Sequence, residues 1–209
     1  MTHRALLTVW FVACFSLLRA EQVCVFTTTS DGKKQLEYTV SQSSRAKLSR
    51  HLMLSPSEGY QEMDGFGYAI TYSACYNLMQ MAPADRKAFL TRTYSRTEGY
   101  GVSYARISIG CSDFSSTEYS LCDKEGLENF RLHTDETKYV IPVLKEILAI
   151  NPDLKIMAAP WTCPKWMKVK SLTNRVGYDS WTSGSLNPNH YDTYAEYFVL
   201  FVKAFAKEG

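Results

Sequence analysis

Beyond residue 62 the hydrophobic and polar positions follow two alternating patterns. Short apolar runs, typical of buried strands, occur at 66–71, 102–109 and 154–159. Segments with apolar residues at helical spacing follow these runs, at 83–94, at 139–150 and from about 191 onwards. Pro83 stands at a favourable first helical position, and Gly209 stands where a helix cap is expected. The pattern therefore predicts three strand-then-helix units in succession.

Consecutive units of this kind with apolar strands indicate an α/β fold, with a parallel sheet covered by helices. The loops after the second and third strands are long, whereas the turns from helix back to strand, at 98–101 and 151–153, are tight. This asymmetry favours a (β/α)8 barrel of the TIM type, in which the loops after the strands build the active face. A doubly wound sheet is the alternative. Its glycine-rich phosphate turn would follow the first strand, whereas the glycines of 64–67 precede or open that strand.

The number of units limits this interpretation. A complete barrel needs eight units and about 250 residues. Because only about three units are visible, we expect a partial, truncated TIM barrel with an unpaired strand edge and an uncovered apolar stripe on its helices.

The first 62 residues differ from the rest. Residues 1–20 join a short basic region to an apolar stretch and end at the small residue Ala20, which predicts a secretory signal peptide too short for a transmembrane span. A lipid-modified Cys14 is the alternative, and with either the protein is expected to be secreted, periplasmic or held at the cell surface. Residues 21–62 are polar, with β-prone runs at 23–26 and 36–40 that predict strands of a small sheet or a covering segment. The expected division is therefore 1–20, 21–62 and 63–209.

Composition narrows the function by exclusion. The 209 residues are 45% hydrophobic and 21% charged, with a net charge of +2, which is typical of an ordinary globular protein. Neither a nucleic acid partner nor a membrane surface is indicated, because no basic run or stripe is present. Removal of Cys14 with the signal leaves five cysteines, so at least one thiol is free or pairs outside the chain. We expect no metal site and no cofactor, since the histidines are scattered and no Cys-x-x-Cys pair occurs.

Candidate binding residues follow the second and third strands. Asp113 and Phe114 place a carboxylate beside an aromatic ring, the pair of groups that commonly grips a sugar; a turn or cap role is the alternative for Asp113. Trp161 and Trp166 lie on a loop stiffened by prolines, where each can serve either as a ligand platform or as packing. Arg106 lies within the second strand. If buried, it needs a carboxylate partner, either in a structural ion pair or as an orienter of catalytic carboxylates.

Asp64 is a second acidic candidate, beside Gly65 and Gly67. A turn role is the interpretation we favour. A catalytic pair with Asp113 is the alternative, although nothing in the sequence shows that the two converge.

Several blocks along the chain resemble glycoside hydrolase family 30, which includes glucosylceramidases and β-1,6-glucanases. The blocks occur in order at 63–67 (MDGFG), 104–115 (YARISIGCSDFS), 158–168 (AAPWTCPKWMK), 184–186 (GSL) and 194–198 (YAEYF). The resemblance implies a (β/α)8 barrel with a side β-sandwich, to which the segment before Met63 would contribute strands, and retaining hydrolysis of a β-glucoside or β-glucan. It also implies that Asp113 and Trp161 contact the innermost sugar, while Arg106 supports the catalytic carboxylates. Trp166 is then expected to pack.

The chain departs from the family pattern in one respect. The resemblance implies an acid/base glutamate in an Asn-Glu-Pro block after the fourth strand and a nucleophilic glutamate near the end of the seventh, and neither block occurs in these residues. We therefore expect the amino-terminal part of a secreted retaining β-glycosidase, inactive by itself; a non-catalytic carbohydrate-binding remnant is the alternative. The linkage, glucan or ceramide, stays open, as do the oligomeric state and the roles of Tyr178 and Trp181, which can be outer-subsite aromatics or a small loop core.

Overall fold

The computed structural model describes residues 22–42 and 57–209, which fall into two compact units divided after Tyr60. The predicted signal segment lies outside the described residues. In the first unit, β1 (Gln22–Thr27) and β2 (Glu37–Gln42) form an antiparallel hairpin in which Val25 pairs with Thr39. The β-prone runs at 23–26 and 36–40 are thus strands, as expected. The rings of Phe26 and Tyr38 lie 5.1 Å apart and are both exposed.

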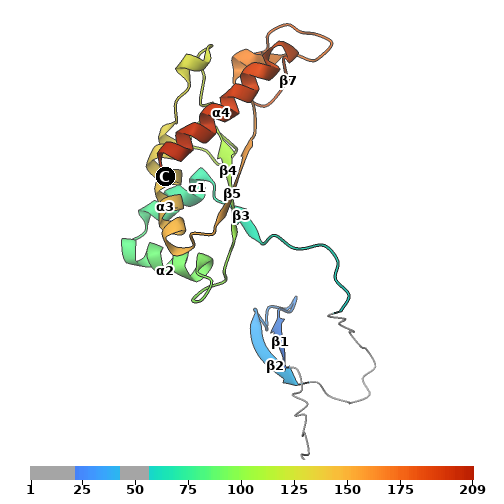
Figure 1. The fold of residues 1–209 in the computed structure, drawn as a ribbon, viewed down its shortest axis with the longest axis vertical. Coiled ribbons are helices and arrows are strands. Elements are labelled where there is room, and N and C mark those ends of the chain that lie inside the picture. The colour runs from blue at the N-terminus through green and yellow to red at the C-terminus, as the bar shows by residue number, and fades with distance from the viewer. Residues whose placement is uncertain (1–21, 43–56) are drawn as a thin grey trace, which may run out of the picture. The chain divides into compact units, whose positions relative to one another are not determined.

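The second unit is built on a three-stranded parallel sheet in the order β3-β4-β5 (Figure 1). Its strands are β3 (Gly67–Ala69), β4 (Tyr104–Ile109) and β5 (Lys155–Pro160), within or next to the three predicted runs. Gly67 is required at the start of β3, because a Cβ there would lie 2.1 Å from the Tyr104 carbonyl oxygen. Among the described residues the outer edge of β5 has no partner strand. The sheet is therefore the partial barrel wall that the sequence predicts.

Helices connect and cover the strands. They are α1 (Tyr72–Gln80), α2 (Pro83–Tyr94), α3 (Ile141–Ile150) and α4 (Tyr191–Lys207). A single π-helical turn, Glu136–Val140, leads into α3, and a short hairpin pairs β6 (Lys168–Val169) with β7 (Ser185–Leu186). None of the helices in the described part of the chain is long and apolar enough to cross a membrane.

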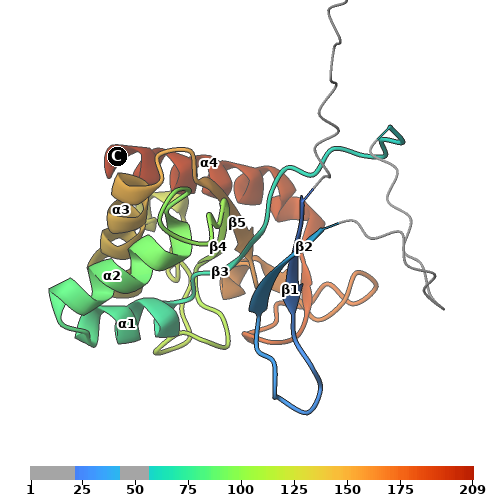
Figure 2. The same cartoon turned by 90° about the horizontal axis from the view of Figure 1, so that it is seen from below.

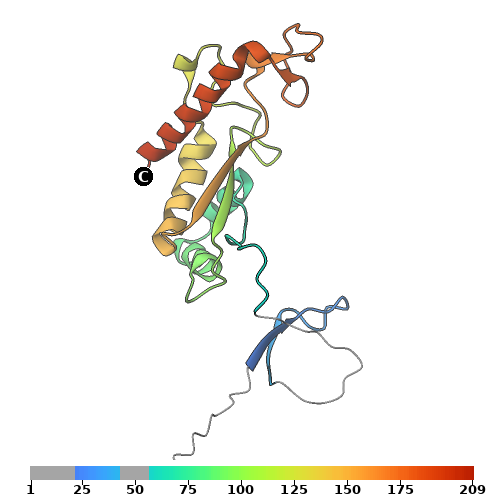
Figure 3. The same cartoon turned by 45° about the vertical axis from the view of Figure 1, so that its right-hand side comes forward.

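The core lies between one face of the sheet and the helices (Figure 3). Side chains alternate along β4, so Ala105, Ile107 and Ile109 are buried, while Arg106 on the other face is exposed. Residues of all four helices join this core: Cys75, Leu78, Leu90, Tyr94, Val143, Leu144, Ile147, Tyr197 and Phe201. Figure 2 shows α1, α2 and α3 grouped beside the strands, with α4 crossing them. Among the described residues, no helix lies over the face that carries Arg106 (Figure 3), as expected for the inner face of a barrel wall.

Candidate functional site

The loop after β4 presents Asp113 to solvent. Gly110, at φ +79, lets the chain turn away at the end of the strand. A tight turn follows: the Ser112 amide donates to Ser115 Oγ at 3.0 Å, and the Phe114 amide donates to Ser112 Oγ at 3.2 Å. These serines satisfy the turn, and the Asp113 carboxylate is exposed and accepts no hydrogen bond from any described residue. The carboxylate is thus free to bind a ligand.

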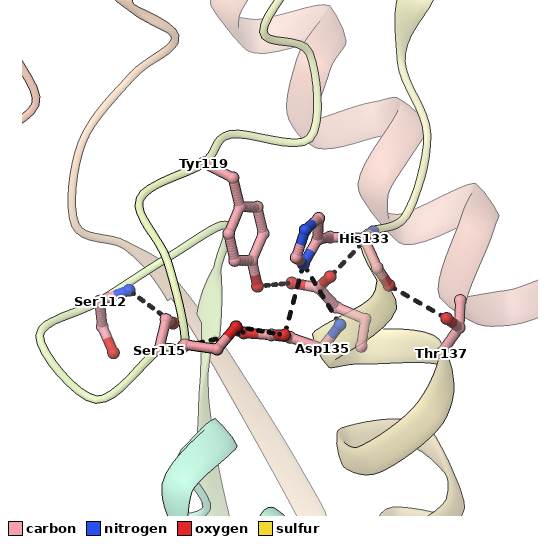
Figure 4. A network of polar contacts seen from close by, with 8 residues as sticks. Ser112, Ser115, Tyr119, His133, Asp135 and Thr137 are labelled. Atoms are coloured by element: carbon pink, nitrogen blue, oxygen red, sulfur yellow. Dashed lines mark hydrogen bonds and ion pairs between the residues drawn. The ribbon is translucent and has the colours of Figure 1, made fainter.

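Buried carboxylates anchor the far end of this loop (Figure 4). Tyr119 donates its hydroxyl to Glu136 Oε1 at 2.7 Å, and the His133 amide donates to Glu136 Oε2 at 2.9 Å. Burial raises the pKa of the Glu136 carboxyl, while these two hydrogen bonds oppose the shift. The Tyr119 carbonyl accepts the Cys111 amide at 3.1 Å. Glu136 therefore connects the start of α3 to the base of the loop that carries Asp113.

Asp135 holds the same loop at a second point. Its buried carboxylate accepts the Ser116 hydroxyl at 3.0 Å and the Ser116 amide at 3.3 Å. It also lies 3.4 Å from His133 Nδ1, and the His133 ring stacks on Tyr119 at 3.8 Å (Figure 4). These contacts hold the Asp113 loop in one conformation without a ligand. A loop that became ordered only on binding would reduce the affinity by its loss of conformational entropy.

The loop after β5 separates its two tryptophans. Trp161 directly follows the strand and is 53% exposed. Trp166, in the short helical turn Lys165–Met167, donates its indole N–H to the Cys122 carbonyl at 2.8 Å and packs against the core. The structure therefore leaves the Trp161 ring available to a ligand, whereas Trp166 is a packing residue.

A pocket of about 730 Å³ opens at this end of the sheet. It is lined by Cys111, Ser112, Asp113, Glu118, Trp161, Thr162, Cys163, Lys168, Trp181, Thr182, Ser183, Gly184, Leu186 and Tyr194. It brings Asp113 and Trp161 into one concave site, together with Trp181 from the long third loop. Tyr178 is not part of its lining. The second carboxylate of the pocket, Glu118, was not foreseen, because no motif marks it in the sequence.

Two further predicted residues lie beside the pocket instead of lining it. The carbonyl of Phe114 accepts the amide of Ser73 at 3.1 Å and its hydroxyl at 2.6 Å, so this backbone links the loop to α1, while the ring is half exposed. Arg106 is exposed and makes no ion pair with any described residue. Its guanidinium instead lies 5.8 Å from the centre of the Trp161 ring. A carboxylate partner was expected only for a buried arginine, and this one is exposed.

Asp64 lies at the opposite end of the sheet. It precedes β3, and its carboxylate pairs at 3.4 Å with Lys155, the first residue of β5. Asp113 follows the carboxyl end of β4, a strand of six residues that spans about 20 Å. The two carboxylates therefore do not converge, and the turn interpretation of Asp64 is the one that the structure favours.

The pocket also contains two buried cysteines. Burial raises the pKa of both the Cys111 and the Cys163 thiol, so both stay protonated at neutral pH. All five cysteines within 22–42 and 57–209 are free thiols, and four of them are buried. Among these residues no group of three or more histidine, cysteine, aspartate or glutamate side chains is placed to hold a metal ion. What the pocket offers is two carboxylates, hydroxyls and aromatic faces.

These features define a class. A parallel sheet with helices on one face and an aromatic, carboxylate-bearing pocket at the carboxyl ends of its strands is the arrangement of part of a TIM-barrel domain, in which this end of the strands is the active face. The chain belongs to glycosyl hydrolase family 30, whose TIM-barrel domain matches residues 63–209. The family resemblance of the sequence blocks is thereby confirmed.

Several known proteins are similar to this chain. It is 30% identical to the lysosomal acid glucosylceramidase of Mus musculus over 189 residues, and 29% identical to an endo-1,6-β-D-glucanase of Neurospora crassa over 161 residues. These matches cover 88% and 74% of this chain, and 36% and 32% of the relatives. The solved structure of the endo-β1,6-glucanase BT3312 is 57% identical, with a TM-score of 0.80 over 89% of this chain and 40% of that one. The chain thus spans about a third of the length of the curated relatives it matches.

Proposed function

We propose that this chain is the sugar-binding part of a secreted retaining β-glycosidase that acts on β-linked glucose. The observation that carries the proposal is the single pocket shared by Asp113 and Trp161. An aromatic face stacks on the apolar face of a pyranose ring, while a carboxylate accepts hydrogen bonds from two hydroxyls. Phe114 supports the site through its backbone link to α1.

The two groups that cleave the bond are proposed to come from outside these 209 residues. Retaining hydrolysis needs an acid/base and a nucleophile about 5.5 Å apart, one on each side of the glycosidic bond. Asp113 and Glu118 both lie on the loop after β4 and are assigned to binding. Arg106 is proposed to face the catalytic carboxylates across the open inner face of the sheet, where a guanidinium would keep the nucleophile ionised.

A β-1,6-linked glucan is the favoured substrate, and a glucosylceramide is the alternative. The support for the glucan is the 57% identity to an endo-β1,6-glucanase, against 30% to a lysosomal glucosylceramidase. Trp181 extends the aromatic lining of the pocket beyond Trp161, which suits a substrate of several sugar rings. The basic and apolar segment at 1–20 supports export.

The test compares the 209-residue chain with the product of the complete open reading frame that contains it. We expect the complete protein to hydrolyse β-1,6-glucan with retention of anomeric configuration, as followed by NMR, and the 209-residue chain to bind the oligosaccharide without cleaving it. Metal-independent hydrolysis by the pure shorter chain would contradict the placement of the catalytic groups. A complete protein that neither binds nor cleaves any β-glucoside would contradict the function itself. An in-frame Asn-Glu-Pro block after the last codon is the expected sequence result, whereas a stop codon there would favour a non-catalytic remnant.

A further inference from the structure

Lys168 lies at the base of the pocket and is only 6% exposed. Its ammonium donates to three backbone carbonyls, those of Ser180 at 2.7 Å, Trp181 at 3.0 Å and Ser183 at 3.2 Å. An ammonium group has three N–H bonds, and all three are used here. Although Lys168 lines the pocket, it therefore has no donor left for a ligand.

The ammonium is also buried without a carboxylate counter-ion among the described residues. Burial lowers the pKa of Lys168. A buried charge is costly unless it is well hydrogen-bonded, so three carbonyl dipoles must compensate it. Such an arrangement exposes the protein to a large penalty if the loop that carries the carbonyls moves away.

The three carbonyls belong to the segment 180–183. This segment contains Trp181 and forms one wall of the pocket, called here the Trp181 wall. Other contacts also hold this wall: Trp181 packs against the core, and the Lys165 ammonium lies 4.9 Å from the centre of its ring. Lys168 differs from these in bonding to three backbone carbonyls of the wall at once. The hairpin beside it pairs only two residues of β6 with two of β7. Lys168, in contrast, is joined to Trp161 by a short stretch with Pro164 and a helical turn. The ammonium therefore ties the Trp181 wall to the element that carries the Trp161 ring.

We propose that Lys168 is a positioning residue that fixes the Trp181 wall relative to Trp161, and so sets the affinity of the pocket for a second sugar ring. The inference rests on the proposed function, in which the first ring lies on Trp161. Lys168 does not itself touch the sugar. Its effect should appear only with ligands long enough to reach Trp181.

The test replaces the ammonium with a thioether side chain of similar length, Lys168→Met. Lys170→Met is the matched control, because Lys170 is exposed, two positions further along the chain, and its side chain bonds to none of the described residues. The probes are glucose and the β-1,6-linked glucose disaccharide, measured by calorimetry on the full chain. We expect Lys168→Met to bind the disaccharide about tenfold more weakly and glucose within about threefold of the original chain. An unchanged disaccharide affinity, or an equal loss for both sugars, would overturn the proposal.

A ligand-free measurement separates this proposal from the proposed function. The Ser183 amide donates to Ser180 Oγ at 3.2 Å, so its hydrogen exchange reports on the order of the wall. If the original chain binds neither sugar, the proposed function fails. The positioning role then still predicts about tenfold faster exchange at Ser183 in Lys168→Met than in Lys170→Met. Equal exchange rates in the two variants would refute it.

A second variant covers the case in which Lys168→Met does not fold. Gly184→Ala keeps the ammonium, but a Cβ at φ +89 would lie 2.9 Å from both Tyr178 Cδ1 and the Val169 carbonyl oxygen. The added methyl group must therefore displace the same wall. We expect the same selective loss of disaccharide affinity, and retention of that affinity would count against the proposal.

Discussion

The guanidinium carbon of Arg106 lies 5.8 Å from the centre of the Trp161 ring. Arg106 projects from the face of β4 that is opposite the buried core, and Trp161 is the first residue after β5. A guanidinium over the face of a tryptophan is attracted by the ring quadrupole. This contact therefore couples the orientation of the Trp161 ring, on which we propose that the sugar stacks, to Arg106 in the middle of β4.

Removal of that contact should loosen the Trp161 ring without unfolding the protein. Arg106→Met is expected to weaken sugar binding about two- to fivefold, since an exposed cation–π contact is worth about 0.5–1 kcal/mol. The free energy of unfolding should change little, because Arg106 is exposed. Calorimetry with glucose and denaturant titration measure the two quantities.

Arg92→Met is the matched control for this variant. Arg92 makes the same kind of contact, at 5.8 Å from the centre of the Tyr100 ring, but neither residue lines the pocket. Its loss should leave sugar affinity unchanged. If Arg106→Met and Arg92→Met weaken sugar binding equally, the contact between Arg106 and the Trp161 ring has no specific role in binding.

The two tryptophans of the third loop should respond in opposite ways to truncation. Trp161→Ala is expected to lower sugar affinity by about 2 kcal/mol, as for a binding hot spot, with little change in stability, because the ring is 53% exposed. Trp166→Ala is expected to lower the free energy of unfolding by about 3 kcal/mol, because it opens a cavity and leaves the Cys122 carbonyl without its donor. Calorimetry with the sugar checks the affinity of each variant, and thermal unfolding checks its stability. Loss of stability in Trp161→Ala would assign that ring to packing.

The Asp113 carboxylate should contribute to sugar affinity by accepting hydrogen bonds at its particular position, and not only by adding negative charge to the pocket. Asp113→Asn is expected to weaken sugar binding by about 1.5–3 kcal/mol, the range for a hydrogen bond to a charged group. Stability should be unchanged, since the carboxylate bonds to no described residue. Glu118→Gln removes the same charge from the same pocket and should have a smaller effect on sugar affinity. Equal losses in the two variants would mean that only the negative charge of the pocket matters.

The strands and the larger helices could be predicted because their signals are local. Runs of apolar residues marked β4 and β5, and Pro83 marked the first residue of α2. Helix α1 was missed. Its nine residues do carry apolar side chains at helical spacing, at Tyr72, Cys75, Tyr76 and Met79, but the run is short and was not recognised. Its start depends on the Thr71 hydroxyl, which accepts the Ala74 amide at 3.3 Å.

The pocket was predictable only in part. Asp113 and Trp161 follow strands, so their place on the active face could be inferred from the order of elements. Lys168 could not be found, because its partners are backbone carbonyls 12 to 15 residues away, and every residue carries such a carbonyl. Trp181 stayed ambiguous for a similar reason, since only the folded loop shows that it faces the pocket.

Glu136 provides a test of the support behind the Asp113 loop. Its pKa in the folded protein is raised above the ordinary value of 4.5, with burial as the main cause. From pH 4.5 up to the folded-state pKa, the folded protein holds this proton more tightly than the unfolded chain does, so this group lowers the free energy of unfolding as the pH rises. Below pH 4.5 the carboxyl is protonated in both states and this contribution no longer depends on pH.

Glu136→Gln should therefore make the free energy of unfolding fall less steeply with rising pH, in the window that begins at pH 4.5. The amide keeps only one acceptor oxygen, so it cannot accept from both Tyr119 and the His133 amide as the carboxylate does, and this adds a change in stability that does not depend on pH. The slope is thus the diagnostic quantity, measured by urea titration at several pH values. Glu125→Gln, at an exposed position, should leave the slope unchanged. Identical slopes in the original chain and in Glu136→Gln would show that the buried carboxyl carries no such penalty.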